Sequence, residues 1–192
     1  MKYSLLSILI LFELGSLTAQ SFVGKLNPYP VASTDIDLAA DTLKILAIMV
    51  EFQQDADGTT AGNGKFGSIY SQNYGNAILD PLPHDKNYFE THLEFVKNYF
   101  EKVSKGQLVI QYTVLPDTFS VSDRMRNYSP APGSENFTPL ADFSVEAWTL
   151  ANQIYSGFNF SDYDVFLIFH AGVGRDVSLP GSIGNERDLP MN

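Results

Sequence analysis

The chain has 192 residues, of which 44% are hydrophobic, and its 12 basic and 22 acidic residues give a formal net charge of −10. This length suits one ordinary domain, and the apolar fraction exceeds that of a disordered chain. Because there is no cysteine, a disulfide scaffold, a thiolate zinc site and a cysteine nucleophile are excluded. The acidic balance argues against nucleic acid as a partner, since binding through phosphates needs basic residues.

The first residues have the layout of a secretory signal peptide. Lys2 is followed by an apolar run over residues 5–12, and the small residue Ala19 marks the expected cleavage site. The run is too short to span a bilayer, which needs about 20 apolar residues. Glu13 fits this pattern poorly, and a buried amphipathic helix is the less favoured alternative. We therefore predict a signal peptide over residues 1–19 and a secreted or extracytoplasmic product, with no membrane contact after the signal is removed.

The next segments predict a lead, a strand and a loop. Residues 20–43 are polar and contain Pro28 and Pro30, which favours a linker or a pro-segment-like lead. The nearly continuous apolar run 44–52 has the length of a strand buried on both faces. Turn-forming residues dominate 53–82, and a loop of this length in a compact domain is often functional.

Apolar residues then recur at helical spacing from Asp85 onward, which predicts a helix. Its apolar stripe consists of Phe89, His92, Leu93, Val96, Tyr99, Phe100 and Val103. We expect Gly106 to end the helix in the left-handed conformation. Residues 108–115 alternate in the manner of a strand, which we expect to end at Pro116.

The rest of the chain predicts a second helix and a third strand. Residues 122–141 form a Pro-rich polar loop, and Asp142 can cap a helix that ends near Tyr155. The apolar stripe of that helix consists of Val145, Trp148, Ala151, Ile154 and Tyr155. Residues 163–170 predict another buried strand, and residues 171–192 show no element. The order strand, helix, strand, helix, strand is typical of an α/β sheet with helices packed on it.

The three histidines, His84, His92 and His170, do not have the spacing of a zinc protease. The H-E-x-x-H motif of such enzymes places two histidines one helical turn apart so that both bind one ion. His84 and His92 are separated by about 12 Å along a helix, which is too far to share a metal directly. We interpret His92 as a core histidine and His84 as a residue at the entry to the helix.

His170 is the strongest candidate for a functional position. It ends the last predicted strand, where sites gather in open α/β sheets. The following glycines at 172 and 174 would permit a sharp turn or a close backbone approach. Val177 stands where a dinucleotide-binding loop needs a third glycine, so we do not expect such a loop. Arg175 and Asp176 form either a plain loop ion pair or a direct part of a site.

A second short pattern lies in the long loop. Asp55, Asp57 and Gly58 begin like a calcium-binding loop, but Thr59 and Thr60 occupy the positions of the next oxygen ligand and of the glycine. A turn is therefore the favoured interpretation. The sequence has no G-x-S-x-G motif, no phosphate-binding loop and no paired-carboxylate signature.

Three blocks of the chain resemble the front half of the immune inhibitor A type metallopeptidases (peptidase family M six). The first block is residues 44–52, the second lies within residues 83–106, and the third is residues 163–172 with 174–176. Together the likeness covers about residues 44–190. It implies a zincin, in which a twisted mixed sheet packs with helices and zinc is held by H-E-x-x-H and a third ligand downstream. Such enzymes polarise the peptide carbonyl on zinc and use the glutamate to activate a water.

In that family the zinc motif lies further along than this chain reaches, so no catalytic, cofactor-binding or metal-ligating residue is assigned, His170 included. The resemblance implies that residues 44–192 are a partial metallopeptidase-like domain of the α/β class, the incomplete N-terminal half of a zincin. The implied function is the N-terminal part of a secreted zinc metalloendopeptidase, inactive by itself. A full-length relative would bind zinc, with calcium as a further candidate, and would act on proteins or peptides. The alternative is an exported, non-catalytic module that binds protein or polysaccharide.

Overall fold

The computed structural model describes residues 41–67, 82–175 and 187–190. The elements are β1 (Asp41–Glu51), α1 (Lys86–Val103), β2 (Leu108–Ser120), α2 (Met125–Tyr128), α3 (Thr138–Ile154), the 3-10 helix η2 (Phe160–Asp162) and β3 (Val165–His170). The predicted signal peptide and most of the predicted lead, residues 1–40, lie outside the described residues. The last three residues of that lead, 41–43, belong to β1.

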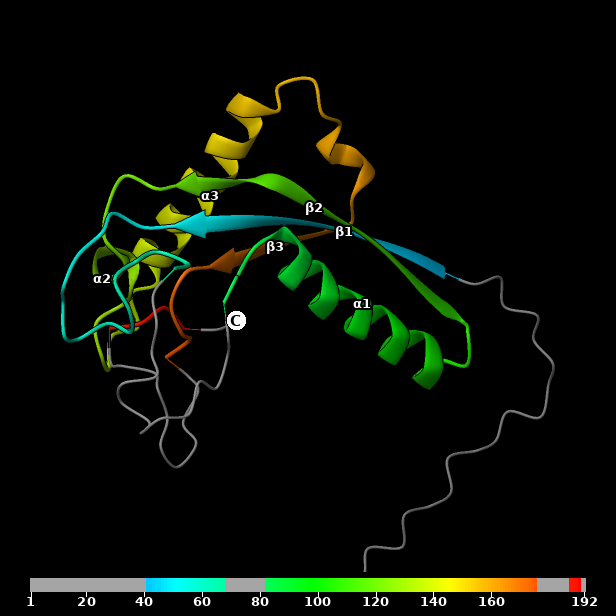
Figure 1. Cartoon of the computed structure of the whole chain (residues 1–192), viewed down its shortest axis with the longest axis horizontal. Helices are drawn as coiled ribbons and strands as arrows, with labels where there is room; N and C mark the ends of the chain where they lie inside the picture. The colour runs from blue at the N-terminus through cyan, green and yellow to red at the C-terminus, as the bar shows by residue number, and fades with distance from the viewer. Residues whose placement is uncertain (1–40, 68–81, 176–186, 191–192) are drawn as a thin grey trace, which may run out of the picture. The chain divides into compact units, whose positions relative to one another are not determined.

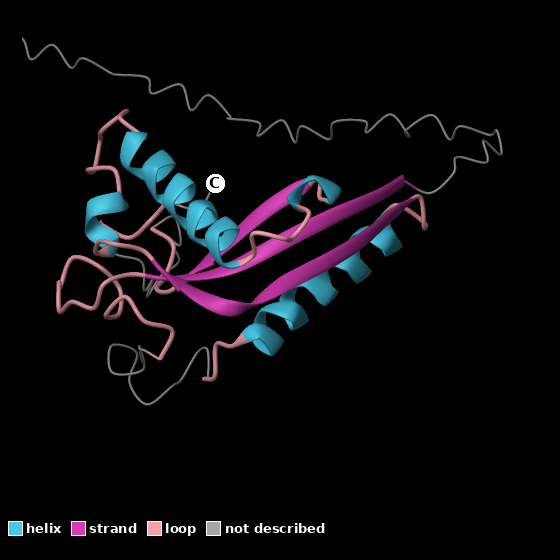
Figure 2. Ribbon diagram, turned by 90° about the horizontal axis from the view of Figure 1, so that it is seen from above, coloured by secondary structure: helices cyan, strands magenta, loops and turns pink. Residues whose placement is uncertain are grey.

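The predicted α/β class is confirmed by a parallel sheet with the strand order β2-β1-β3, shown in Figure 1. The strand pairs of the described residues are all parallel, so they contain no antiparallel strand of the expected mixed sheet. Helix α1 covers one face of the sheet and α3 covers the other, as Figure 2 shows. This follows from right-handed crossovers, because the step from β1 to β2 and the step from β2 to β3 run in opposite directions across the sheet.

The central strand β1 is buried on both faces, as the apolar run predicts. Leu46, Ile48 and Val50 pack in the cluster that includes residues of α3, whereas Ala47 and Met49 pack in the cluster that includes residues of α1. All five side chains are at most 2% exposed. Alternating side chains of a strand point to opposite faces, so a strand covered on both sides must be apolar at successive positions.

The predicted end of β2 is wrong. The strand continues through Pro116 to Ser120. Ala47 pairs with Val114, whereas Met49 pairs with Thr118, so β2 has extra residues at this point. Pro116 lies within this irregularity, on a strand with no neighbour on its other side among the described strands. Proline is tolerated at bulges and sheet edges because its missing N–H interrupts no ladder there.

Helix α1 begins and ends as predicted. The Asp85 carboxylate caps it by accepting the N–H of Tyr88 at 3.0 Å. Gly106 takes a left-handed φ of 81°, and Lys105 before it also has a positive φ. The interpretation of His92 as a core residue is wrong, because its side chain is exposed. Periodicity fixes the angle of a side chain on a helix, whereas burial also requires a neighbour over that position.

Helix α3 begins at Thr138, four residues before the predicted cap at Asp142, and has a proline in its first turn. Its buried residues are Phe143, Ala147 and Ala151. Val145 and Ile154 from the predicted stripe are more than 60% exposed, so this part of the prediction is wrong. The short helix α2 occupies part of the predicted loop 122–141. No helix in the described ranges is long and apolar enough to cross a membrane.

Candidate functional site

The carboxyl ends of the three parallel strands lie at the same end of the sheet. The strands finish at Glu51, Ser120 and His170. Open α/β sheets bind their ligands outside this end. The position of His170 is therefore as the sequence predicts, since it is the last residue of β3 and next to Val50 of the central strand.

An apolar groove of about 690 Å³ lies along β3 and extends to this end. It is lined by Phe89, Leu140, Phe143, Ser144, Trp148, residues 166–170, Gly172, Gly174, Leu189 and Pro190. The ring of Trp148 meets that of Phe166 edge-on at a centroid distance of 5.2 Å. Phe166 is still 47% exposed, so an aromatic surface is open to solvent in the groove. Pockets of this size and apolar character are typical of binding sites.

The prediction of a buried third strand is only partly right. Val165 and residues 167–170 have intermediate burial, and Phe166 is exposed. The reason is the position of β3 at the edge of the sheet, where the described residues place a neighbour on one side alone. An apolar segment of strand length does not show whether the strand lies at the centre or at the edge.

Among the residues that the structure describes in the groove lining, His170 is the one titratable residue. Its Nδ1–H donates to the carbonyl oxygen of Ala171 at 3.0 Å, which leaves Nε2 as the other ring nitrogen. Burial lowers the pKa of the imidazole, so the ring is neutral near pH 7. The hydroxyl of Ser144 donates to the carbonyl of Leu140 instead of to the histidine. The described residues of the groove thus include no nucleophile paired with a base, and their chemistry suits the binding of an apolar group.

Gly172 forms the tight corner after β3, in agreement with the expected close approach. Its φ is 99°, which side-chain-bearing residues rarely adopt. A Cβ added at this position would overlap the terminal methyl of Met125 and lie 3.3 Å from the carbonyl oxygen of Ala61. Met125 is 1% exposed and so has little room to move. The glycine thus allows the chain to turn against α2 and the loop after β1.

A buried carboxylate in the predicted structureless tail holds the loops together at this end. Asp188 is fully buried and accepts the N–H of Ala61 at 2.6 Å. The hydroxyl of Ser129 donates to the carbonyl oxygen of Asp188 at 2.8 Å. The side chain of Arg187 donates to the carbonyl of Ser129. This role could not be predicted from the sequence, because a single Asp beside an Arg in a Gly- and Pro-rich tail is ordinary for a surface loop.

Arg175 also joins loop segments through hydrogen bonds. Its guanidinium donates to the carbonyl oxygen of Pro130 at 2.9 Å, and its N–H donates to Leu189. Asp176, the partner of Arg175 in the predicted loop ion pair, lies outside the described residues. Arg175 thus joins the segment after β3 to the segment after α2.

The turn interpretation of Asp55 and Asp57 agrees with their hydrogen bonds. Asp55 accepts the N–H of Asp57, and Asp57 accepts both the N–H and the hydroxyl of Thr59. Arg126 donates to the second carboxylate oxygen of Asp57 at 2.9 Å. The Thr59 hydroxyl and N–H, with Arg126, lower the pKa of Asp57 to about 2. Its oxygens are thus occupied by protein donors.

The other two histidines lie apart from the groove lining. His84 precedes the capping Asp85, as the helix-entry interpretation predicts, and its ring centroid is 4.6 Å from that of Tyr88. The Nδ1–H of His92 donates to the carbonyl of Tyr88 at 2.9 Å. Across the described ranges, no three His, Cys, Asp or Glu side chains are grouped so that they could hold a metal ion.

Comparisons with protein-family models, curated proteins and solved structures returned no match to this chain. The function is therefore inferred from the groove, the open edge of β3 and the sequence blocks.

Proposed function

We propose that this chain is the N-terminal part of a secreted zinc metalloendopeptidase of the immune inhibitor A type, and that these 192 residues alone cleave no peptide bond. The three sequence blocks at residues 44–52, 83–106 and 163–176 support the family. In a complete relative, zinc would be held by an H-E-x-x-H motif, which this sequence does not contain. The described residues do not fit a catalytic zinc, since they offer no group of three suitable ligands.

The observation that carries the proposal is the composition of β3. Ile168 packs in the cluster on the α3 side, whereas Leu167 and Phe169 pack in the cluster on the α1 side. Exposed edge strands usually carry charges or proline, which discourage pairing with other chains. Residues 165–170 have neither and are apolar at five successive positions before His170. This is the composition of an interior strand, so we infer that a further strand pairs with β3 in the complete domain.

The groove supports the same inference, because its open apolar surface lies beside that edge. Burial of the exposed part of Phe166 would stabilise the complete domain by about 2 kcal/mol, if about 90 Å² is removed from water at about 25 cal/mol per Å². A further antiparallel strand at β3 would also produce the mixed sheet of a zincin. We therefore assign the groove and the β3 edge to contacts with the remainder of the peptidase domain.

The first test is genetic and biochemical. The gene region beyond codon 192 should encode H-E-x-x-H in one of its reading frames. The joined polypeptide should hydrolyse casein, and a chelator or a substitution of the motif glutamate by glutamine should abolish this activity. The 192-residue chain by itself should neither bind stoichiometric zinc nor hydrolyse casein. Stoichiometric zinc binding by the 192-residue chain, chelator-sensitive casein hydrolysis by it, or the lack of the motif downstream would contradict the proposal.

The second test probes the groove directly. Trp148 is the single tryptophan of the chain, so its fluorescence reports on this surface. In the joined polypeptide its emission should shift to shorter wavelength and become less accessible to acrylamide. Phe166→Asp should destabilise the joined polypeptide more than it destabilises the 192-residue chain, in which the ring is already 47% exposed. Phe95→Asp is the matched control, because Phe95 is 71% exposed on α1 and should tolerate the charge in both.

A further inference from the structure

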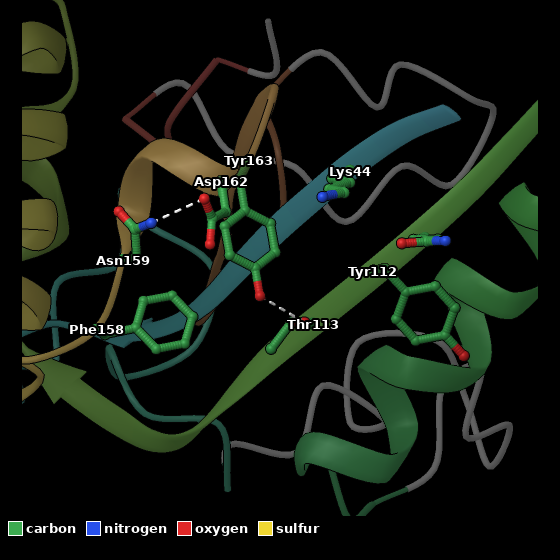
Figure 3. A pocket seen from close by; sticks show the side chains of 8 residues that line it. Lys44, Tyr112, Thr113, Phe158, Asn159, Asp162 and Tyr163 are labelled. Atoms are coloured by element: carbon green, nitrogen blue, oxygen red, sulfur yellow. Dashed lines mark hydrogen bonds between the residues drawn. The ribbon is translucent and has the colours of Figure 1, made fainter. Parts of the chain in front are cut away.

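A second, polar pocket of about 300 Å³ lies near the amino end of the sheet and shares no lining residue with the apolar groove. Figure 3 shows how it is built. Lys44 of β1 and Gln111 of β2 are register partners and form its floor. The segment between α3 and β3 forms its wall, with Phe158, Asn159 and Tyr163.

Several groups of the wall are held in place by hydrogen bonds within the protein. The hydroxyl of Tyr163 donates to the Thr113 hydroxyl at 2.9 Å. The amide of Asn159 donates to one carboxylate oxygen of Asp162 at 2.8 Å, and both bonds are drawn in Figure 3. The Asn159 oxygen in turn accepts the hydroxyl of Ser161. These contacts fix the positions of the wall before any ligand arrives, which reduces the entropy cost of binding.

The polar groups of the floor remain available. Within the part of the chain that the structure describes, neither the Lys44 ammonium nor the Gln111 side-chain amide has a hydrogen-bond or ion-pair partner. The second carboxylate oxygen of Asp162 is also unused there. The pocket thus offers an ammonium and an amide N–H as donors, and an amide oxygen and a carboxylate oxygen as acceptors.

The charges and rings of the pocket indicate the class of ligand. Lys44 and Asp162 have opposite charges, and Asp164, whose carboxylate accepts the N–H of Lys44, adds a further negative charge close by. An ion of either sign would meet both attraction and repulsion here, because the ammonium and the carboxylates lie close together, so these charges select no simple anion or cation. The rings of Phe158 and Tyr163 are stacked at a centroid distance of 5.6 Å and supply a rigid apolar wall. A neutral ligand with many hydroxyl groups and one apolar face satisfies both features.

We propose that this pocket binds a neutral saccharide of one or two rings. The size of the pocket is at the lower end of the range for small-molecule sites, which matches a short sugar better than a long chain buried along its length. The hydroxyls bond to Lys44, Gln111 and Asp162, and the C–H face of a ring lies against the aromatic wall. This inference goes beyond the peptidase proposal and does not depend on it, since no residue of the groove takes part.

The test is a titration of the 15N-labelled 192-residue chain with three disaccharides: cellobiose, maltose and diacetylchitobiose. We expect saturable shifts at the pocket residues for at least one of them, with a Kd in the millimolar range, as one small shallow site allows. Gln111→Ala and Lys44→Met should each weaken binding about tenfold, because each removes a hydrogen-bond donor. Both residues are exposed, so the variants should fold, and their Tm verifies this.

Matched controls separate the pocket from non-specific effects. Gln153→Ala and Lys102→Met change exposed residues of the same types on α3 and α1, outside the pocket lining, and should leave binding unchanged. The proposal is overturned if none of the three sugars gives saturable shifts at these residues. It is also overturned if the pocket variants bind as tightly as the controls, or if acetate or ethylammonium binds the pocket more tightly than every sugar. Casein hydrolysis is unaffected by any of these outcomes, so the two proposals fail independently.

Discussion

Substitution of Gly172 by alanine tests the reasoning about the end of β3. The glycine has a φ of 99°, and an alanine there would have unfavourable backbone geometry that costs about 1–2 kcal/mol. The new Cβ would also overlap the methyl of Met125, which is 1% exposed, and overpacking of a core costs about 1–3 kcal/mol. The free energy of unfolding should therefore fall by about 2–5 kcal/mol, which lowers the Tm by about 4–20 °C.

The two causes can be separated with a double-mutant cycle. Met125→Ala removes the group that the new Cβ would meet, so Gly172→Ala in that background should cost only the backbone strain of about 1–2 kcal/mol. Urea unfolding followed by circular dichroism measures each free energy. Gly157→Ala is the control, because an added Cβ there meets nothing within 4 Å. If Gly172→Ala is as neutral as Gly157→Ala, or costs the same in both Met125 backgrounds, the steric argument is wrong.

Three titrations test the electrostatic arguments. Thr59→Val and Arg126→Ala should each raise the pKa of Asp57 from about 2 toward its ordinary 3.8 in carboxyl NMR titrations; an unchanged pKa in both variants would contradict the stated cause. Burial lowers the pKa of His170, so the unfolded chain binds a proton at a higher pH than the folded chain does. The free energy of unfolding should therefore fall as the pH drops below about 6.5, and it should fall less steeply in His170→Asn. Burial and a hydrogen bond to the Asp117 carboxylate raise the pKa of Tyr155 to about 12. The free energy of unfolding should therefore fall above about pH 10, where the unfolded chain loses the proton, and it should fall less in Tyr155→Phe. Equal losses in the two proteins would refute this cause.

The main elements of the fold could be predicted because their signals are local. The apolar run of β1, the cap at Asp85 and the left-handed glycine at 106 depend on residues close together in the chain. Their order predicted the α/β class, and the position of His170 at the end of a strand is also as predicted. The polar pocket gave no such signal, because Lys44, Gln111 and Asp162 come from segments far apart in the sequence.

The amino-acid sequence by itself determined the alternation of strands and helices, the burial of residues 45–50 of β1 and the need for glycine after β3. Only the tertiary structure decided that β2 continues past Pro116, that His92 is exposed and that β3 lies at an edge. The physical reason is that each of these depends on which neighbour is present. A proline is tolerated where no ladder bond is required, a side chain is buried only where another element covers it, and an apolar strand is buried only where strands lie on both sides.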